Sequence, residues 1–263
     1  MPFAAKVRPL QKTMKVEPFG VGDFVHIYNQ GNNKEAIFAD KSDRWRFLWS
    51  LRFFNDQRNI TEFARSLGGL VVSQKEFLTK LGPRDYQDGH NTFEWHSELG
   101  EQQPLVEIIA YHLAPNHYHL LVREIVKGGT SKFMQKLGGG YTMYRNAKSA
   151  NAGRIFRSQY RGKLIDSEKY LQYVDVYIQV FNAFELFDGG IEEALKNFDQ
   201  AFSFALDYPF NSLGESYGLR NLGIIQRNCF NDIFDDLKIY KEFSRDALIT
   251  RNARQILGKL KME

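Results

Sequence analysis

Two of the chain's six histidines, His117 and His119, stand one residue apart in the segment PNHYHLL, at positions 115–121. The apolar residues that follow the pair are typical of a buried strand. Residues i and i+2 of a strand point to the same face, so the two imidazoles converge, about 7 Å apart by strand rise. Two neutral imidazoles at that distance can share one divalent cation. The alternative is a pair of hydrogen-bonded core histidines.

A second set of reactive side chains is predicted on a helix that spans 168–181. Leu171, Val174, Ile178 and Phe181 form its apolar stripe. Tyr170, Tyr173 and Tyr177 form a parallel stripe about 100° to one side, at the border between core and solvent. A tyrosine there can hold its ring against a sheet while its hydroxyl reaches the sheet's edge. The alternative is that all three are ordinary half-buried tyrosines.

The segment 125–165 contains nine basic residues and no acidic ones, whereas the rest of the chain is net acidic. The basic residues are Lys127, Lys132, Lys136, Arg145, Lys148, Arg154, Arg157, Arg161 and Lys163, and they alternate with Phe133, Tyr141, Tyr144, Phe156 and Tyr160. Basic side chains follow a nucleic-acid backbone and aromatic rings stack on bases, so this composition indicates binding of single strands. The alternative is a solvated basic face with core aromatics.

Composition and targeting signals narrow the class of protein. The chain has 263 residues, 43% of them hydrophobic, which is enough for a packed core. Its one cysteine, Cys229, excludes an intramolecular disulfide, and the first residues lack the apolar run of a secretory signal. No stretch of 18 apolar residues predicts a membrane span. We expect a cytoplasmic protein that associates with the nucleoid and makes no contact with membranes.

Hydrophobic periodicity predicts three strands, at 23–30, 104–113 and 117–125, and two short extended pieces within 154–165. A first helix is predicted over 41–56, with Ser42 or Asp43 as its cap. A second is predicted to begin with Thr130 or Ser131 as its cap and to break at the glycines 138–140. A third is predicted over 166–184, with Asp166 or Ser167 as its cap. This order favours the α+β class, a ferredoxin-like antiparallel sheet covered by helices.

The pattern changes after Phe187, where only amphipathic helical segments follow. We therefore predict two domains, 1–187 and a helical C-terminal extension, 188–263. The last predicted helix carries Arg251, Arg254, Lys259 and Lys261, which we interpret as solvated, with contact to nucleic acid as the alternative. A long loop is predicted between 68 and 103.

Five blocks follow one another as they do in a known family: HIYNQGNNKEAIFADKSDRWRFL, AYHLAPNHYHLLV, SKFMQKLGGGYTMYRNAK, GRIFRSQYRGKLI and YLQYVDVYIQVFNAFEL. Over residues 20–187 the chain resembles the single-tyrosine HUH transposases, and most closely the REP-associated tyrosine transposases. The resemblance implies an HUH endonuclease core in which His117 and His119 hold Mg²⁺ or Mn²⁺. It also implies that Tyr177 cleaves single-stranded DNA.

The block around Tyr177 departs from the family pattern. The family often has Tyr-Ile-x-x-Asn-Pro, whereas here Asn182 follows Tyr177 by five residues and Ala183 replaces the proline. On an ideal helix Asn182 would be rotated about 140° from Tyr177 and would reach the metal only if the helix unwound. We predict His117, His119 and Asn182 as the metal ligands, with Gln179 and His26 as competitors for the third position. Gln30 also stands where relatives commonly have Arg.

The predicted function is that of a metal-dependent single-stranded DNA endonuclease and strand transferase, a transposase that forms a 5′-phosphotyrosine intermediate. The resemblance implies REP-like hairpin or palindromic DNA as the partner and leaves open a homodimer that donates the tyrosine in trans. The predicted nucleic-acid contacts are Lys132, Lys136, Arg145, Lys148, Arg154, Arg157, Tyr160, Arg161 and Lys163. The alternatives are a non-catalytic binder of structured single-stranded DNA or RNA and a hydrolytic metal phosphodiesterase.

Overall fold

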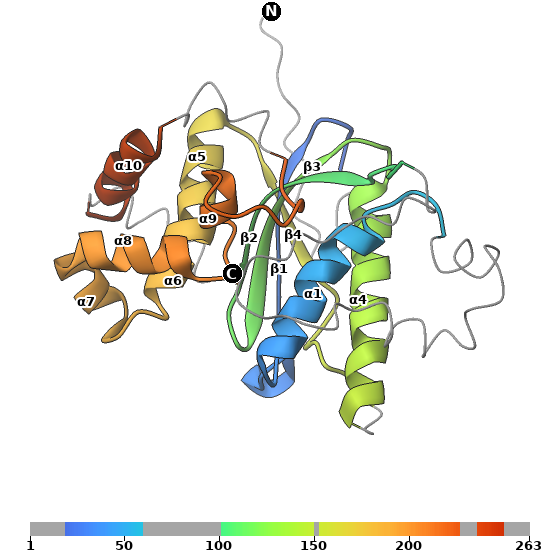
Figure 1. Ribbon diagram of the computed structural model, residues 1–263. Helices are drawn as coiled ribbons and strands as arrows, with labels where there is room; N and C mark the ends of the chain where they lie inside the picture. Colours follow the sequence, from blue (N-terminus) through green and yellow to red (C-terminus); the bar gives the residue numbers. More distant parts are fainter. Residues whose placement is uncertain (1–18, 60–100, 150–152, 227–235, 250–263) are drawn as a thin grey trace, which may run out of the picture.

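Four antiparallel strands form the sheet at the centre of the molecule (Figure 1). The computed structural model describes residues 19–59, 101–149, 153–226 and 236–249. The strands β1 (Phe24–Gln30), β2 (Val106–Leu113), β3 (His117–Glu124) and β4 (Arg161–Ile165) lie in the order β2-β3-β1-β4. Because β3 lies between β1 and β2, this is the split βαβ arrangement of ferredoxin-like folds. The predicted fold class is therefore confirmed.

Helices α1 (Lys41–Phe54) and α4 (Gly129–Ser149) cover one face of the sheet (Figure 1). The core beneath them combines strand residues with residues of both helices, among them Val25, Ile27, Leu120, Val122, Trp45, Leu48, Trp49, Phe53, Phe133, Leu137 and Tyr141. The α4 residues recur at a spacing of four, the periodicity of a helix that packs by one face, whereas ten of the fourteen residues of α1 are buried.

The opposite face of the sheet contacts α5 (Glu168–Val176), the π-helical turn η3 (Tyr177–Phe181) and α6 (Asn182–Phe184). Beyond them lie α7 (Gly190–Lys196), α8 (Phe198–Asp207), α9 (Leu213–Ser216) and α10 (Leu237–Ile249). Ala201 of α8 and Tyr240 of α10 belong to the same buried cluster as Leu121 of β3 and Ile178 of η3. The C-terminal helices thus share a core with the sheet. The predicted division of the chain at residue 187 stays a prediction.

Helix α1 begins at a cap different from either predicted residue. The Asp40 carboxylate accepts a hydrogen bond from the Asp43 backbone N–H at 3.0 Å, and the Ser42 hydroxyl donates to the same carboxylate at 2.6 Å. Asp40 has the extended backbone typical of a cap residue. Ser42 and Asp43 therefore lie inside the helix, and the predicted cap was wrong by two or three residues.

The start of α4 is satisfied by a side chain from the preceding strand. The Glu124 carboxylate accepts hydrogen bonds from the backbone N–H groups of Gly128 and Thr130, at 2.8 and 3.2 Å. The first N–H groups of a helix have no partner within the helix, so this carboxylate replaces the predicted Thr130 or Ser131 cap. For α5 the Ser167 side chain accepts from the Tyr170 backbone N–H, so the cap is one of the two residues predicted there.

Three consecutive glycines, Gly138, Gly139 and Gly140, lie inside α4, which continues through them without a break. The predicted break was wrong, and at Gly140 close packing offsets the low helix propensity of glycine. A Cβ atom at Gly140 would overlap the ring of Phe54, so the missing side chain is what lets α1 and α4 approach closely. Gly138 and Gly139 have open space around them, and nothing in the structure explains their choice.

Several sequence predictions fall outside the described residues. They are the loop between 68 and 103 over most of its length, Cys229, and the basic positions Arg251, Arg254, Lys259 and Lys261. Among the residues that the structure describes, none of the helices has the length and hydropathy needed to cross a membrane.

Candidate active site

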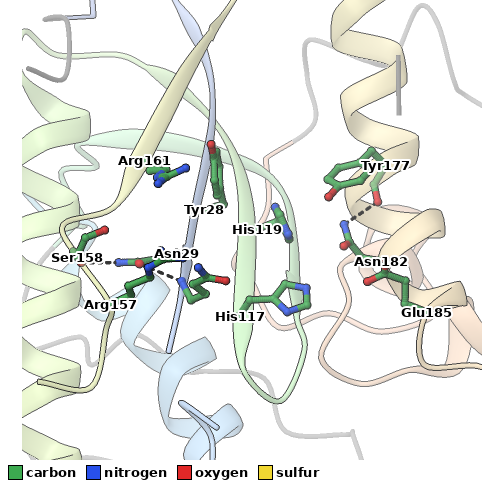
Figure 2. A pocket seen from close by; sticks show the side chains of 11 residues that line it. Tyr28, Asn29, His117, His119, Arg157, Ser158, Arg161, Tyr177, Asn182 and Glu185 are labelled. Carbon is green, nitrogen blue, oxygen red and sulfur yellow. Dashed lines mark hydrogen bonds between the residues drawn. The ribbon is translucent and has the colours of Figure 1, made fainter. Parts of the chain in front are cut away.

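His117 and His119 project from β3 toward the face that carries η3 (Figure 2). Their ring centroids are 5.2 Å apart. Each ring is fixed at Nδ1, because His117 Nδ1 lies 2.8 Å from Asn116 Oδ1 and His119 Nδ1 lies 2.9 Å from His26 Nε2. The prediction that both imidazoles share one face is confirmed. With Nδ1 engaged, Nε2 is the nitrogen of His119 that remains for a ligand, while His117 has a further hydrogen bond with the side chain of Asn182.

Tyr177 lies against the histidines of its own chain. Its ring is perpendicular to that of His119, with centroids 5.3 Å apart, and its side chain is 4% exposed. The two other tyrosines of the predicted stripe lie elsewhere. Tyr173 packs on Phe243 at 5.8 Å, and the ammonium of Lys163 lies 5.5 Å from the ring of Tyr170. Tyr177 is therefore the tyrosine of this helix that meets the histidine pair.

Asn182 reaches the same place because the helix changes its hydrogen-bond pattern after Tyr177. In η3 the Asn182 backbone N–H donates to the Tyr177 carbonyl, an i→i+5 bond. The Asn182 side-chain Nδ2 donates to the same carbonyl at 2.8 Å. In an α-helix, residue i+5 would lie about 140° away, whereas the π-helical turn stacks it over residue i. The sequence predicted that Asn182 could reach the metal only if the helix unwound after Tyr177. The structure has a π-helical turn at that place.

These side chains line a cavity of about 220 Å³ that opens between β1, β3 and η3. Its lining residues are Tyr28, Asn29, Gln30, His117, His119, Arg157, Ser158, Arg161, Tyr177, Asn182 and Glu185. In Figure 2 the two arginines lie on one side of the histidines and Tyr177, Asn182 and Glu185 on the other. The cavity therefore combines a phenol, imidazoles, an amide, a carboxylate and guanidinium groups.

Burial keeps the histidines of this site neutral. Burial lowers the pKa of His117, although the nearby Glu185 carboxylate and a hydrogen bond with Asn182 act in the opposite direction. Burial, together with the neighbouring histidines His26, His117 and His112, holds the pKa of His119 well below its usual range. A neutral imidazole has a nitrogen lone pair, so both rings are in the form that binds a cation.

The two competitors for the third ligand position point away from the cavity. Gln179 Nε2 donates to both carboxylate oxygens of Asp175, and its Oε1 accepts from Ser212 and Ser216. His26 lies behind His119 and does not line the cavity. In the part of the chain that the structure describes, no three His, Cys, Asp or Glu side chains form a metal-binding group. Among the residues that line the cavity, Asn182 offers an amide oxygen and Glu185 a carboxylate as a third protein ligand.

Two of the predicted nucleic-acid residues lie in the cavity. Arg157 and Arg161 line it, and Arg157 also joins the segment before β4 to β1, since its backbone N–H donates to the Gln30 carbonyl at 2.9 Å. Arg154 is exposed, three residues before Arg157. Lys163 lies on β4, next to the ring of Tyr170. Two guanidinium groups thus face the same space as Tyr177.

The basic residues of α4 instead hold α4 to neighbouring parts of the chain. Arg145 and Lys148 each form an ion pair with the fully buried Asp43 of α1, at 2.9 and 2.7 Å. Lys132 donates to the Gln57 carbonyl at 2.6 Å, and Lys136 donates to the carbonyls of Asp56 and Arg58. The Tyr160 hydroxyl lies 3.4 Å from that of Ser131. For these residues the structure provides intramolecular partners and gives no contact with the cavity.

Five lining residues were absent from the predicted site, namely Tyr28, Asn29, Gln30, Ser158 and Glu185. Two of them carried a usable signal. Tyr28 lies two residues after His26 on β1, so strand alternation places it on the histidine face. Glu185 follows Asn182 by three residues, the spacing of neighbours on one helix face. The others depend on how the ends of β1 and the chain before β4 meet, which the sequence alone does not reveal.

Comparison with known proteins gives one distant match. No protein-family model matches the chain, and no curated protein matches it. Among solved structures, the chain is similar to a REP-associated tyrosine transposase bound to a REP hairpin. The match covers 78% of this chain and 84% of the other, at 11% identity and a TM-score of 0.39. A likeness of this size does not assign the chain to a family.

Proposed function

We propose that the protein is an endonuclease and strand transferase for single-stranded DNA in which Tyr177 is the nucleophile. The observation that supports this best is that one chain brings Tyr177, His117, His119 and Asn182 to one cavity. A phenol, two neutral imidazoles and an amide are the groups that metal-assisted tyrosyl transfer needs. Because a single chain supplies all four, we propose that Tyr177 acts in cis, with the histidines of its own chain.

The donor set fits Mg²⁺ or Mn²⁺. His117 and His119 would hold the cation through Nε2, and Asn182 would hold it through Oδ1, since its Nδ2 already donates to the Tyr177 carbonyl. Carboxylate and carbonyl oxygens suit Mn²⁺ and Mg²⁺, and Glu185 adds a carboxylate to the same cavity. When bound, the cation would polarise phosphate oxygens and offset negative charge that develops in the transition state.

Tyr177 performs the covalent step. Its Oη forms a bond to phosphorus while the bond from phosphorus to the 3′-oxygen breaks, and the phenol proton passes to water. The 3′-oxygen leaves as a hydroxyl after taking up a proton, so the products are a 5′-phosphotyrosine and a free 3′-hydroxyl. A 3′-hydroxyl from another end can attack the phosphotyrosine and release Tyr177. Strands are then joined without an external energy source.

The substrate follows from the shape and charge of the cavity. Tyr177 is almost fully buried, so the scissile phosphate must enter the cavity to reach it. Duplex DNA is stiff, with a persistence length of about 50 nm, whereas a single strand can bend inward. Arg157 and Arg161 supply positive charge for the phosphates on either side. The sequence resemblance adds the expectation that the strand flanks a REP-like hairpin.

The test is capture of a covalent adduct. The full-length protein is incubated with a library of labelled single-stranded hairpins and Mn²⁺, then denatured, and the attached DNA is sequenced. We expect a 5′-linked adduct with wild type, none with Tyr177→Phe, and none in EDTA. Binding of the same hairpins should survive the Tyr177→Phe change, because a single hydroxyl is removed.

Tyr173→Phe is the matched control, since Tyr173 lies one turn earlier on the same helix and packs on Phe243. We expect its adduct yield to equal that of wild type. An adduct that persists in Tyr177→Phe would show that another residue is the nucleophile. Cleavage without any adduct would indicate a hydrolytic phosphodiesterase, and binding without cleavage at any Mn²⁺ concentration would indicate a non-catalytic binder.

A further inference from the structure

His26 forms a buried pair with His119. His26 Nε2 lies 2.9 Å from His119 Nδ1, and the two rings stack with an interplanar angle of 23° and centroids 5.2 Å apart. The residues come from neighbouring strands, where Tyr28 is the direct partner of His119 and His26 is its diagonal neighbour on the same face. The contact is therefore built into the pairing of β1 with β3.

The two rings of this pair differ in their access to the cavity. His26 has no exposed surface and does not line the cavity, whereas His119 is 7% exposed and does line it. The ring of Tyr177 packs edge-on against both, at centroid distances of 5.9 Å for His26 and 5.3 Å for His119. His26 thus lies directly beneath one of the two histidines proposed to hold the cation and cannot contact a ligand itself.

A hydrogen bond between two neutral imidazoles requires a single proton between the facing nitrogens. In one arrangement His119 donates its Nδ1 proton to His26, which leaves a lone pair on His119 Nε2. In the other arrangement His26 is the donor, and the His119 proton then sits on Nε2. Only the first arrangement leaves His119 able to bind a cation at the nitrogen that remains for the cavity.

We propose that His26 is a positioning residue that accepts the Nδ1 proton of His119 and so fixes the His119 tautomer whose Nε2 binds a divalent cation. This inference rests on the proposed function for its consequence in catalysis. It names a residue that acts through another and touches neither substrate nor metal.

The cost of burying His26 favours this role over simple packing. The second nitrogen of its ring, Nδ1, is buried and has no hydrogen-bond partner among the described residues. A buried polar group without a partner costs about 1–3 kcal/mol. A phenylalanine would fill the same space without that cost, so packing alone does not account for an imidazole here. The His26 nitrogen that faces His119 explains the imidazole, because it can accept a hydrogen bond.

The test reads the His119 tautomer in metal-free protein by long-range ¹H–¹⁵N NMR, and then Mn²⁺ affinity by titration calorimetry. In wild type we expect the proton on Nδ1 of His119. In His26→Phe, which keeps a ring and removes the acceptor, we expect a shift toward the Nε2-protonated form and a loss of Mn²⁺ affinity of about 10–100-fold. His26→Gln, which has an acceptor oxygen at the position of Nε2, should restore part of the affinity.

His112→Phe is the matched control, because His112 is also fully buried and is the direct strand partner of His119, but neither of its ring nitrogens has a hydrogen-bond partner among the described residues. It should leave the His119 tautomer unchanged. An Nε2-protonated His119 in wild type, or an unchanged tautomer and Mn²⁺ affinity in His26→Phe, would overturn the inference. The tautomer is read without metal or DNA, so it remains decisive even if wild type forms no adduct and the proposed function fails.

Discussion

At the scale of single residues, basic side chains close together in the sequence have different tasks. Arg157 is exposed and lines the cavity, while Arg145, only twelve positions earlier, is paired with a buried aspartate. Both belong to the acid-free segment whose composition predicted nucleic-acid binding as a whole. Composition locates such a segment, but the partner of each side chain is decided by tertiary contacts.

Arg157→Gln tests the cavity arginines. Loss of one phosphate contact should weaken binding of a labelled single-stranded hairpin about tenfold. The slope of log affinity against log salt should fall by about 0.7 for a single strand. Fluorescence anisotropy titrations at salt concentrations from about 50 to about 200 mM measure the affinity and its salt slope. The unfolding midpoint in urea should not change, because the side chain is exposed.

Arg145→Gln is the matched comparison, with the opposite expected result. It removes one ion-pair partner of Asp43, which is fully buried and also contacts Lys148. The free energy of unfolding should fall by about 1–3 kcal/mol, while the salt slope of binding stays the same. A reduced salt slope with unchanged stability would show that Arg145 contacts DNA, as the sequence predicted.

At the scale of elements, the strands and the main helices were predictable because each repeats its apolar residues at the period of its own geometry. The predictions of helix caps and of a helix break were wrong because these features depend on long-range contacts. Glu124 replaces the cap of α4 from the preceding strand, and Phe54 of α1 occupies the space that a side chain at Gly140 would need. The sequence could state only that Asn182 would lie near Tyr177 if the helix departed from α-helical geometry. It could not predict the departure, because a π-helical turn has no local sequence signature comparable with a cap or a turn residue.

The π-helical turn is anchored at Gln179. Its side chain bonds with Asp175, Ser212, Ser216 and Tyr240, and its carbonyl accepts from Asn211 at 2.6 Å. These partners connect the turn that carries Tyr177 to the C-terminal helices. The geometry of Tyr177 therefore depends on residues far along the chain, which explains why the local pattern alone could not reveal it.

Gln179→Leu should weaken that anchor. The change leaves buried hydroxyl and carboxylate groups without the amide that they contact, at about 1–3 kcal/mol for each group. We expect the free energy of unfolding in urea to fall by about 2–4 kcal/mol in total. Gln172→Leu makes the same substitution on the exposed side of α5 and should change it by no more than about 0.5 kcal/mol. Equal effects of the two substitutions would contradict the anchoring role.

At the scale of the whole molecule, four of the six histidines gather on one face of the sheet. His117 and His119 come from β3, His26 from β1 and His112 from β2, while His90 and His96 lie outside the described residues. Burial lowers the pKa of His26 to about 3, with Lys163 as a second cause. Burial also holds the pKa values of His112 and His119 well below the usual range. The fold therefore requires these rings to stay neutral.

This requirement makes stability depend on pH in a defined direction. Below about pH 6.5 the unfolded chain binds protons at these histidines and the folded chain does not, so stability falls as pH falls. Each such histidine should remove about 2 kcal/mol between pH 7 and pH 5. Urea unfolding at both pH values measures the total. In His26→Phe the difference in the free energy of unfolding between pH 7 and pH 5 should be smaller by about 2 kcal/mol, the contribution of one histidine. Equal stability of wild type at pH 5 and pH 7 would show that the folded protein accepts protons at this face and that its histidines are not held neutral.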